Sequence, residues 1–227
     1  MNPVFPLPQA LVRIANCEQG FPVHRIYCVG RNYADHAREM GSNPEREAPF
    51  FFSKPADAVI GNNSCIAYPS HTQNLHYEVE LVVAIGKSGS DVSLETANDL
   101  IFGYAVGVDL TRRDLQNIAK QQARPWDMAK GFDHSAPIGD IALVQDIGLI
   151  DKGEIVLSVN DDIKQQGDIA DLIWSVQEII AELSTYCCLQ AGDLIFTGTP
   201  AGVGALQAGD KVVASIAGLP QLEITIE

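Results

Sequence analysis

The most informative part of the chain is residues 76–86, His-Tyr-Glu-Val-Glu-Leu-Val-Val-Ala-Ile-Gly. Val, Leu, Ile and Tyr dominate this run, which stops at Gly86, and the pattern predicts a β-strand. Alternate side chains on a strand point to the same face, so we expect Glu78 and Glu80 to lie together beside the core. Two carboxylates in apolar surroundings repel each other and resist the loss of water. Because a hard divalent cation would offset both costs, the strand is a candidate metal site.

A third carboxylate follows another apolar run, Phe102–Val108, which ends at Asp109. Glu78, Glu80 and Asp109, with no cysteine nearby, suit Mg²⁺ or Mn²⁺, and water and substrate oxygens would complete the coordination. The alternative interpretation is an edge strand with two solvated glutamates, which is common in an acidic protein. Spacing alone leaves both interpretations open.

The remaining pattern predicts more strands than helices. Further strands are expected over residues 24–30, 102–108, 155–160, 194–198, 211–216 and 221–226. Helices are expected over 31–40 and 93–100, from Thr111 with Asp114 as a weaker capping box, and from the Ser175–Glu178 capping box to Cys188. Because the helices do not alternate regularly with the strands, we predict a β-rich α+β domain over 21–227 rather than a doubly wound parallel sheet.

Two segments carry no regular pattern. Residues 1–20 begin with prolines at positions 3, 6 and 8 and are expected to form an extended N-terminal arm. Residues 42–48 are polar and are expected to form a mobile surface loop.

Composition restricts the class of protein. The net charge is −14 and the pI is near 4.6, so binding to nucleic acid or to anionic membranes is not expected. The longest apolar runs are too short to cross a bilayer, and the proline-rich start lacks the basic segment of a signal peptide. Five cysteines without a C-x-x-C pair predict reduced thiols and a cytoplasmic protein.

Two further groups of residues are candidates for chemistry. His36 and Glu39, at i and i+3 on a predicted helix, would share one face, and the pair could deprotonate water; the alternative is an ordinary surface helix of mixed charge. In so acidic a chain, a set of basic residues offers anchors for an anionic substrate, although lysines beside apolar residues often only extend to solvent. These are Arg31, Lys54, Arg112, Arg113 and Lys130.

The glycine-rich segment Thr197–Gly204 follows a predicted strand. It lacks the Gly-Lys-Ser/Thr ending of a P-loop and the spacing of a dinucleotide fingerprint, which excludes those two nucleotide motifs. A tight loop that offers backbone N–H groups and threonine hydroxyls to a carboxylate is the better interpretation.

Four segments together resemble one known family. They are Val29–His36, His76–Glu80, Asp109–Asp114 and Thr197–Gly204. In this order they are similar to the fumarylacetoacetate hydrolase family, and specifically to its short single-domain acylpyruvase branch, from about His24 to the end of the sequence. Residues 21–33 and 49–57 look closest to bacterial fumarylpyruvate hydrolases, which act in the gentisate route of aromatic degradation.

The resemblance implies a mixed β-sandwich roll, a homodimer, and Mg²⁺ or Mn²⁺ held by three carboxylates. Carried over by position, the metal ligands are Glu78, Glu80 and Asp109. The catalytic residues implied are a His–Glu pair on a closing lid and a pocket lysine, at His36, Glu39 and Lys130. The positions that line the substrate pocket are Arg31, Arg113, Gln116 and Thr199.

The activity that the resemblance implies is hydrolysis of the C3–C4 bond of a 2,4-diketo acid, with fumarylpyruvate as the best-fitting substrate. The metal would stabilise the departing pyruvate enolate as a Lewis acid, and His36 oriented by Glu39 would activate water. Two alternatives are oxaloacetate decarboxylation, which needs no hydrolytic water, and tautomerisation of a related enol acid. A third is a non-catalytic metal-dependent binding protein, which would have no need of the His–Glu pair.

Overall fold

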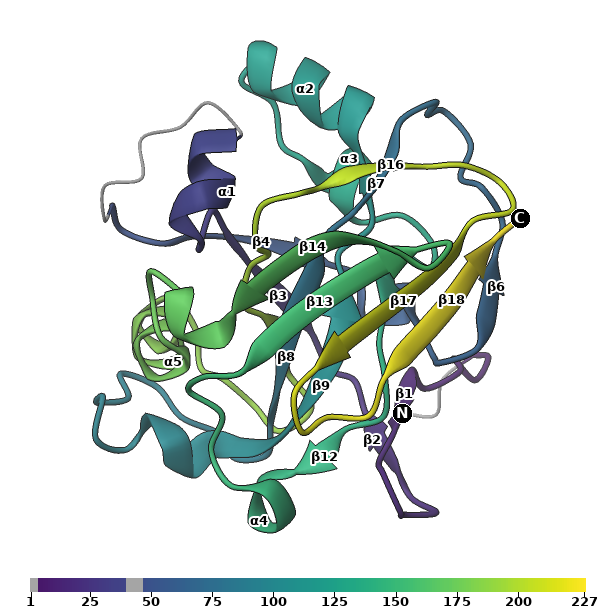
Figure 1. The fold of residues 1–227 in the computed structure, drawn as a ribbon. Coiled ribbons are helices and arrows are strands. Elements are labelled where there is room, and N and C mark those ends of the chain that lie inside the picture. The colour runs from purple at the N-terminus through teal and green to yellow at the C-terminus, as the bar shows by residue number, and fades with distance from the viewer. Residues whose placement is uncertain (1–3, 40–46) are drawn as a thin grey trace.

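The computed structural model describes residues 4–39 and 47–227, and within them two large sheets pack face to face (Figure 1). The six-stranded sheet has the order β12 (Ala142–Leu143), β9 (Ile101–Val108), β8 (Val79–Ile85), β15 (Leu194–Phe196), β3 (Ile26–Gly30), β4 (Phe50–Lys54). The five-stranded sheet has the order β14 (Asp162–Asp168), β13 (Glu154–Val159), β17 (Lys211–Ile216), β18 (Leu222–Ile226), β6 (Ser64–Ile66). The predicted β-rich α+β fold is confirmed.

Smaller elements cover the ends of this sandwich. The remaining strands form a three-stranded sheet, β10 (Thr111–Arg112), β7 (Leu75–Tyr77), β16 (Gly204–Leu206), and two pairs, β1 (Leu11–Arg13) with β2 (Gly20–Pro22) and β11 (Ala136–Pro137) with β5 (Val59–Ile60). The α-helices are α1 (Ala34–Glu39), α2 (Arg113–Gln121), α3 (Asp127–Lys130), α4 (Val144–Ile147) and α5 (Val176–Tyr186). Short 3₁₀ turns are η1 (Ala56–Ala58), η2 (Ala97–Leu100) and η3 (Ile169–Asp171).

The β8 strand is buried along its whole length, which explains why its sequence is apolar without alternation. Leu81 and Val83 belong to the core between the two large sheets, together with Leu157 of β13. Val82 and Ala84 point the other way, into a second apolar cluster on the opposite face of the six-stranded sheet. The strand therefore packs against both apolar clusters.

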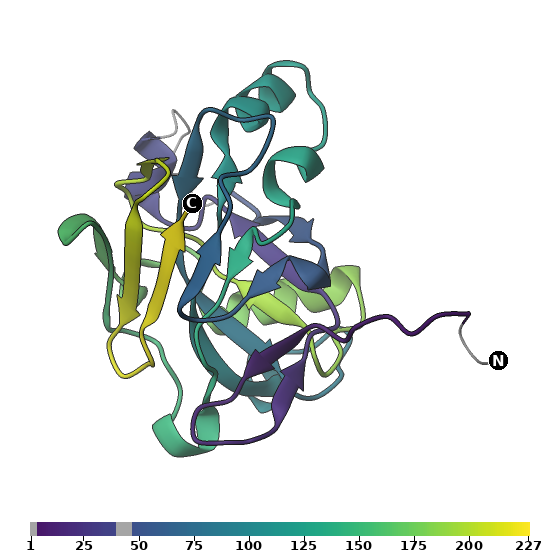
Figure 2. The same cartoon turned by 90° about the vertical axis from the view of Figure 1, so that its right-hand side faces the viewer.

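The N-terminal segment differs from the predicted arm of residues 1–20. Residues 4–10 have no regular structure and extend away from the body (Figure 2), and residues 1–3 lie outside the described part of the chain. From Leu11 the chain forms the β1–β2 hairpin, in which Val12 pairs with Phe21. Both side chains are buried in the second apolar cluster, so burial overrides the polar turn sequence between them.

Several predicted element boundaries are wrong, each for a local reason. The helix predicted over 93–100 is only the turn η2. The helix predicted from Thr111 begins at Arg113, because Thr111 pairs with His76 in β10, and Asp114 accepts hydrogen bonds from Thr72 Oγ1 and Gln73 N. The strand predicted over 76–86 is interrupted at Glu78, between β7 and β8. Most of the predicted loop over 42–48 lies outside the described residues.

The capping box at Ser175 is confirmed, and it begins α5. The Ser175 hydroxyl accepts from Glu178 N, and Glu178 Oε2 accepts from Ser175 N at 2.9 Å. Among the described residues, no helix is long and apolar enough to cross a membrane, and all five cysteines are free thiols.

Replacing Ser175 with alanine is expected to destabilise the fold by about 1 kcal/mol, because an N–H of the first turn of α5 loses its acceptor. In a chain of this size, that change corresponds to a fall in Tm of about 2–4 °C. Thermal unfolding of Ser175→Ala beside Ser88→Ala, an exposed serine that caps no helix, measures it. Equal Tm values for the two variants would contradict the capping role.

Candidate active site

Three buried carboxylates meet where the central strands end. Glu78 stands in the break between β7 and β8, Glu80 is the second residue of β8, and Asp109 follows the last residue of β9. The backbone N–H of Asp109 donates to Glu78 O at 2.8 Å, which closes the two strand ends together. One ligand atom from each carboxylate lies within 4.8 Å of the others. The three predicted metal-ligating residues therefore come together.

Two of the carboxylates are paired with cations. Lys130 Nζ donates to Glu78 Oε2 at 2.8 Å and to Asp109 Oδ2 at 2.6 Å, and Arg113 forms an ion pair with Glu78. Lys54 Nζ lies 2.7 Å from Asp109 Oδ1, at an angle unsuited to a hydrogen bond. Burial alone would raise the pKa of Glu78, but Lys130 and Arg113 outweigh it and hold that pKa below its usual range. The same attraction raises the pKa of Lys130.

Glu80 is different, because none of the ion pairs among the described residues involves it. Its Oε2 accepts one hydrogen bond, from Gly198 N at 2.8 Å. Burial, followed by repulsion from Asp109 and Glu78, raises the pKa of Glu80 well above its ordinary value. A divalent cation among the three carboxylates would neutralise this charge, and three oxygen donors are the ligands that Mg²⁺ and Mn²⁺ prefer. The residues present therefore fit such an ion.

The loop after β15 positions the backbone N–H of Gly198, which donates to Glu80. Gly198 has a φ of +106°, and a Cβ there would lie 2.7 Å from Cβ of Asn32. Asn32 itself is buried and binds the loop, since its Nδ2 donates to Thr197 O at 2.8 Å. The glycine-rich segment thus supports a carboxylate through a backbone N–H, as predicted, but among the described residues the predicted threonine hydroxyls do not: Thr197 Oγ1 donates to Leu81 O, and Thr199 Oγ1 accepts from Gln165.

His36 of the predicted His–Glu pair faces the same space from α1. His36 is buried, and its Nδ1 lies 3.3 Å from Glu39 Oε2. Both oxygens of Glu39 accept from Gly202 N at 3.2 Å, so the carboxylate fixes the helix to the glycine-rich loop. Burial lowers the pKa of His36, and Glu78 and Glu39 only partly oppose this effect. A neutral imidazole at neutral pH is able to accept a proton.

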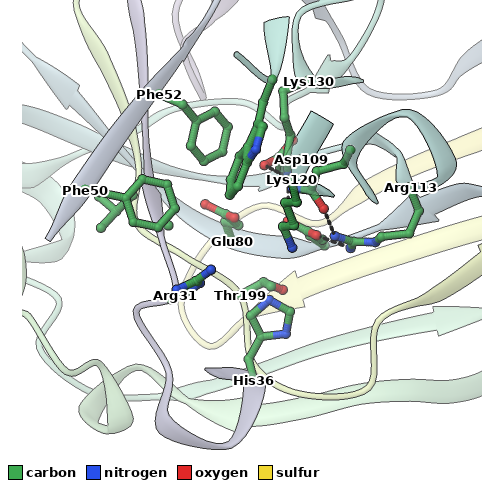
Figure 3. Close-up of a pocket in the computed structure, with 15 residues that line it drawn as sticks. Arg31, His36, Phe50, Phe52, Glu80, Asp109, Arg113, Lys120, Lys130 and Thr199 are labelled. Atoms are coloured by element: carbon green, nitrogen blue, oxygen red, sulfur yellow. Dashed lines mark hydrogen bonds and ion pairs between the residues drawn. The ribbon is translucent and has the colours of Figure 1, made fainter. Parts of the chain in front are cut away.

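These groups surround one cavity that opens to solvent (Figure 3). Of the predicted site residues, all except Glu39 line it, and Glu39 lies behind His36. Arg113 is not free in the cavity, because its guanidinium binds Glu78 and donates to Gln116 Oε1 at 2.6 Å. Thr199 also has a partner, since its Oγ1 accepts from Gln165 Nε2 at 2.8 Å.

Among the polar residues at the site, Gln165, Lys54 and Lys120 were not given a catalytic, metal-binding or pocket-lining role by the family resemblance. Gln165 lies on β14, in the polar run Asp-Ile-Lys-Gln-Gln-Gly-Asp. It bonds to both Thr199 Oγ1 and Val79 N, but nothing in that run predicts that Gln165 is buried. Lys54 was predicted only as one of five possible anchors for an anionic substrate, and it lies instead 2.7 Å from Asp109 Oδ1. Lys120 lines the cavity and has a sequence signal: it follows Arg113 and Gln116 at i+7 and i+4, on the same face of α2.

The chain is similar to known proteins over most of its length. The fumarylacetoacetate (FAA) hydrolase C-terminal family model matches residues 25–227. A fumarylpyruvate hydrolase of Ralstonia sp is 46% identical over 180 residues, which cover 79% of this chain and 93% of the relative. The mitochondrial oxaloacetate tautomerase FAHD1 of Arabidopsis thaliana is 41% identical over 206 residues, which cover 89% of this chain and 91% of the relative.

A solved structure extends the likeness to the whole fold. The crystal structure of fumarylpyruvate hydrolase from Pseudomonas aeruginosa in complex with Mn²⁺ and pyruvate is 50% identical, with a TM-score of 0.96 over 99% of both chains. The family match spans both large sheets and every side chain that lines the cavity. The chain belongs to the fumarylacetoacetate hydrolase family.

Proposed function

We propose that this protein is a metal-dependent hydrolase that cleaves the C3–C4 bond of 2,4-diketo acids, with fumarylpyruvate as its preferred substrate. The observation that carries the proposal is the cavity in which His36, held by Glu39, faces three converging carboxylates. A pure binding protein needs the carboxylates but not the base. The Mn²⁺ and pyruvate named for the Pseudomonas aeruginosa relative support the same chemistry.

Glu78, Glu80 and Asp109 are the proposed ligands of Mg²⁺ or Mn²⁺. When bound, the ion supplies a Lewis acid that stabilises negative charge on keto-acid oxygens. Thr199, fixed by Gln165, is placed to hold the carboxylate at the three-carbon end of the substrate. Arg113 and Gln116 act mainly through Glu78, whose orientation they fix.

His36 is the proposed general base. It takes a proton from water as the water oxygen attacks C4, and the resulting C4 carboxylic acid retains that oxygen. The C3–C4 bond breaks with its electron pair on C3, which takes up a proton, so that one water and one diketo acid give one carboxylic acid and one pyruvate. Glu39 keeps the imidazole oriented and stabilises its protonated form. Lys130, with its ammonium group among the carboxylates, places positive charge near the fragment that becomes negative.

A substrate panel tests this proposal. With Mn²⁺, the purified protein should turn over fumarylpyruvate faster than oxaloacetate. Loss of diketo absorbance measures the first reaction, and release of CO₂ measures decarboxylation of oxaloacetate. The second candidate is an oxaloacetate tautomerase, favoured by the 41% identical relative of that name. Interconversion of enol and keto oxaloacetate without diketo-acid hydrolysis would move the assignment to the tautomerase, and release of CO₂ from oxaloacetate alone would move it to a decarboxylase.

In the pH dependence of kcat/KM, the acid limb, where activity falls as the pH is lowered, should have its midpoint below pH 6.5, the ordinary pKa of histidine. Burial lowers the pKa of His36, so the imidazole stays neutral to lower pH and activity is lost only as the pH falls through this lowered value. Because Glu39 raises the pKa of His36, Glu39→Gln should move the limb to still lower pH. The pH dependence of kcat/KM measures both, and a limb above pH 7 would contradict His36 as the base.

The proposal also covers the location, oligomeric state and metabolic pathway of the protein. We place it as a cytoplasmic homodimer in gentisate degradation, on the strength of the family resemblance alone. Light scattering on the purified protein tests the dimer. Growth on gentisate after deletion of the gene tests the pathway, since a strain that grows normally would exclude an essential role there.

A further inference from the structure

The cavity contains two cations that the metal centre does not use. Lys130 and Arg113 are paired with Glu78, whereas Arg31 and Lys120 line the same cavity. Within residues 4–39 and 47–227, no ion pair involves Arg31 or Lys120. Figure 3 shows Arg31, which follows β3, and Lys120, on α2, directed into the common space.

Aromatic rings hold both cations in place. The Arg31 guanidinium carbon lies 5.7 Å from the ring centroid of Phe50, and Lys120 Nζ lies 5.2 Å from that of Trp126. The two rings contact each other edge to face, with centroids 5.3 Å apart. Because the rings pack together, they form one apolar surface with a cation against each ring.

The backbone supports the same arrangement. Arg31 has a φ of +59°, a conformation that few residues other than glycine adopt, and it projects the side chain away from the direction of β3. A Cβ on the preceding Gly30 would overlap the Phe50 ring, so the ring lies directly against the backbone there. Such strain at a cavity is typical of a functional position.

The electrostatics favour an anion between these groups. Burial, followed by repulsion from Arg113 and Arg31, lowers the pKa of Lys120 to about 8. Glu78 opposes this repulsion only in part, and among the described residues neither Lys120 nor Arg31 has an ion-pair partner, so a carboxylate bound between them would be stabilised. The protein carries a net charge of −14, so this local excess of positive charge runs against the average.

We propose that Lys120 and Arg31 form a subsite for a second carboxylate, at the acyl end of the substrate. This proposal rests on the proposed function and adds the residues that would select 2,4-diketo acids whose acyl group carries a carboxylate, as that of fumarylpyruvate does. With the three-carbon end held at Thr199 and the carboxylate cluster, the acyl chain runs along the surface formed by Phe50 and Trp126 toward the two cations. A neutral acyl group would leave both cations without a counter-charge, which disfavours such substrates.

The test compares kcat/KM for fumarylpyruvate and for acetylpyruvate, whose acyl group is neutral. In Lys120→Met, the fumarylpyruvate-to-acetylpyruvate ratio should fall roughly 10- to 100-fold, mainly through a higher KM for fumarylpyruvate. Lys120→Arg keeps the charge and should keep most of the preference. Lys87→Met, which removes an exposed lysine elsewhere, is the matched control and should leave the ratio unchanged. Inhibition by fumarate should weaken in parallel in Lys120→Met, while inhibition by pyruvate should persist.

The possible results distinguish a failure of the proposed subsite from a failure of the proposed hydrolase function. Wild-type turnover of both substrates, with the same ratio in Lys120→Met, would overturn the subsite and leave the hydrolase intact. An equal loss for both substrates would assign Lys120 a structural role and would also overturn the subsite. Failure of the wild-type protein to hydrolyse either diketo acid would contradict both proposals.

Discussion

Replacing Glu80 with glutamine is expected to lower kcat/KM for fumarylpyruvate by about 10³-fold or more without unfolding the protein. Glu80 is the carboxylate of the cluster that no described cation neutralises, so it has the greatest need of a bound dication. Glutamine keeps the shape and can still accept from Gly198 N, but it removes the charge that binds the ion. Loss of a Lewis acid removes several kcal/mol of transition-state stabilisation, which is about three powers of ten in rate.

Thermal unfolding separates this effect from damage to the fold. Without added metal, Glu80→Gln should unfold at or above the Tm of the wild type, because a buried charge with no cationic partner has been removed. Addition of Mn²⁺ should raise the Tm of the wild type and leave that of the variant almost unchanged. Glu18→Gln, an exposed substitution, should behave as the wild type. A full Mn²⁺ response together with full activity in Glu80→Gln would exclude the proposed metal site.

Replacing His36 with glutamine should reduce diketo-acid hydrolysis by about 10²- to 10⁴-fold, the usual contribution of a positioned general base. The metal ligands are untouched by this change, so the rise in Tm on addition of Mn²⁺ should persist. Glu39→Gln should cost less, because the imidazole remains and loses only its orienting carboxylate and one partner of Gly202 N.

The same variant distinguishes hydrolysis from chemistry that needs no water. If His36 activates water, any release of CO₂ from oxaloacetate by the wild type should survive His36→Gln far better than hydrolysis does. Equal losses of the two activities would give His36 a role in binding or proton transfer common to both. Unchanged hydrolysis in His36→Gln would remove the base from the mechanism.

The sequence predicted the central strands well because burial there is nearly complete. A strand buried on both faces is apolar throughout, as β8 is, and the carboxylates at its start are conspicuous against that background. Strands with an exposed face and little apolar sequence were missed. β14 contains mostly polar residues, and it is a strand because it pairs with β13 along most of its length.

Local spacing in the sequence predicted some of the contacts at the site, but not those between segments far apart in the chain. The i, i+3 relation of His36 and Glu39 follows from helix geometry, and the structure brings the two side chains within 3.3 Å. The spacing of Glu78 and Glu80 suggested a shared strand face, yet the structure joins them through a break in the strand. No local pattern could reveal that Gln165 supports Thr199 or that Asn32 leaves room only for a glycine at position 198, since these contacts join segments far apart in the chain.

The most direct test of the account is the analysis of products from fumarylpyruvate. NMR of a reaction containing purified protein and Mn²⁺ should show equimolar fumarate and pyruvate, formed at the rate at which the diketo acid disappears. Chelation of the metal should stop the reaction, and renewed Mn²⁺ should restore it. Persistence of intact fumarylpyruvate under these conditions, or its conversion only between keto and enol forms, would contradict the assignment of this protein as a diketo-acid hydrolase.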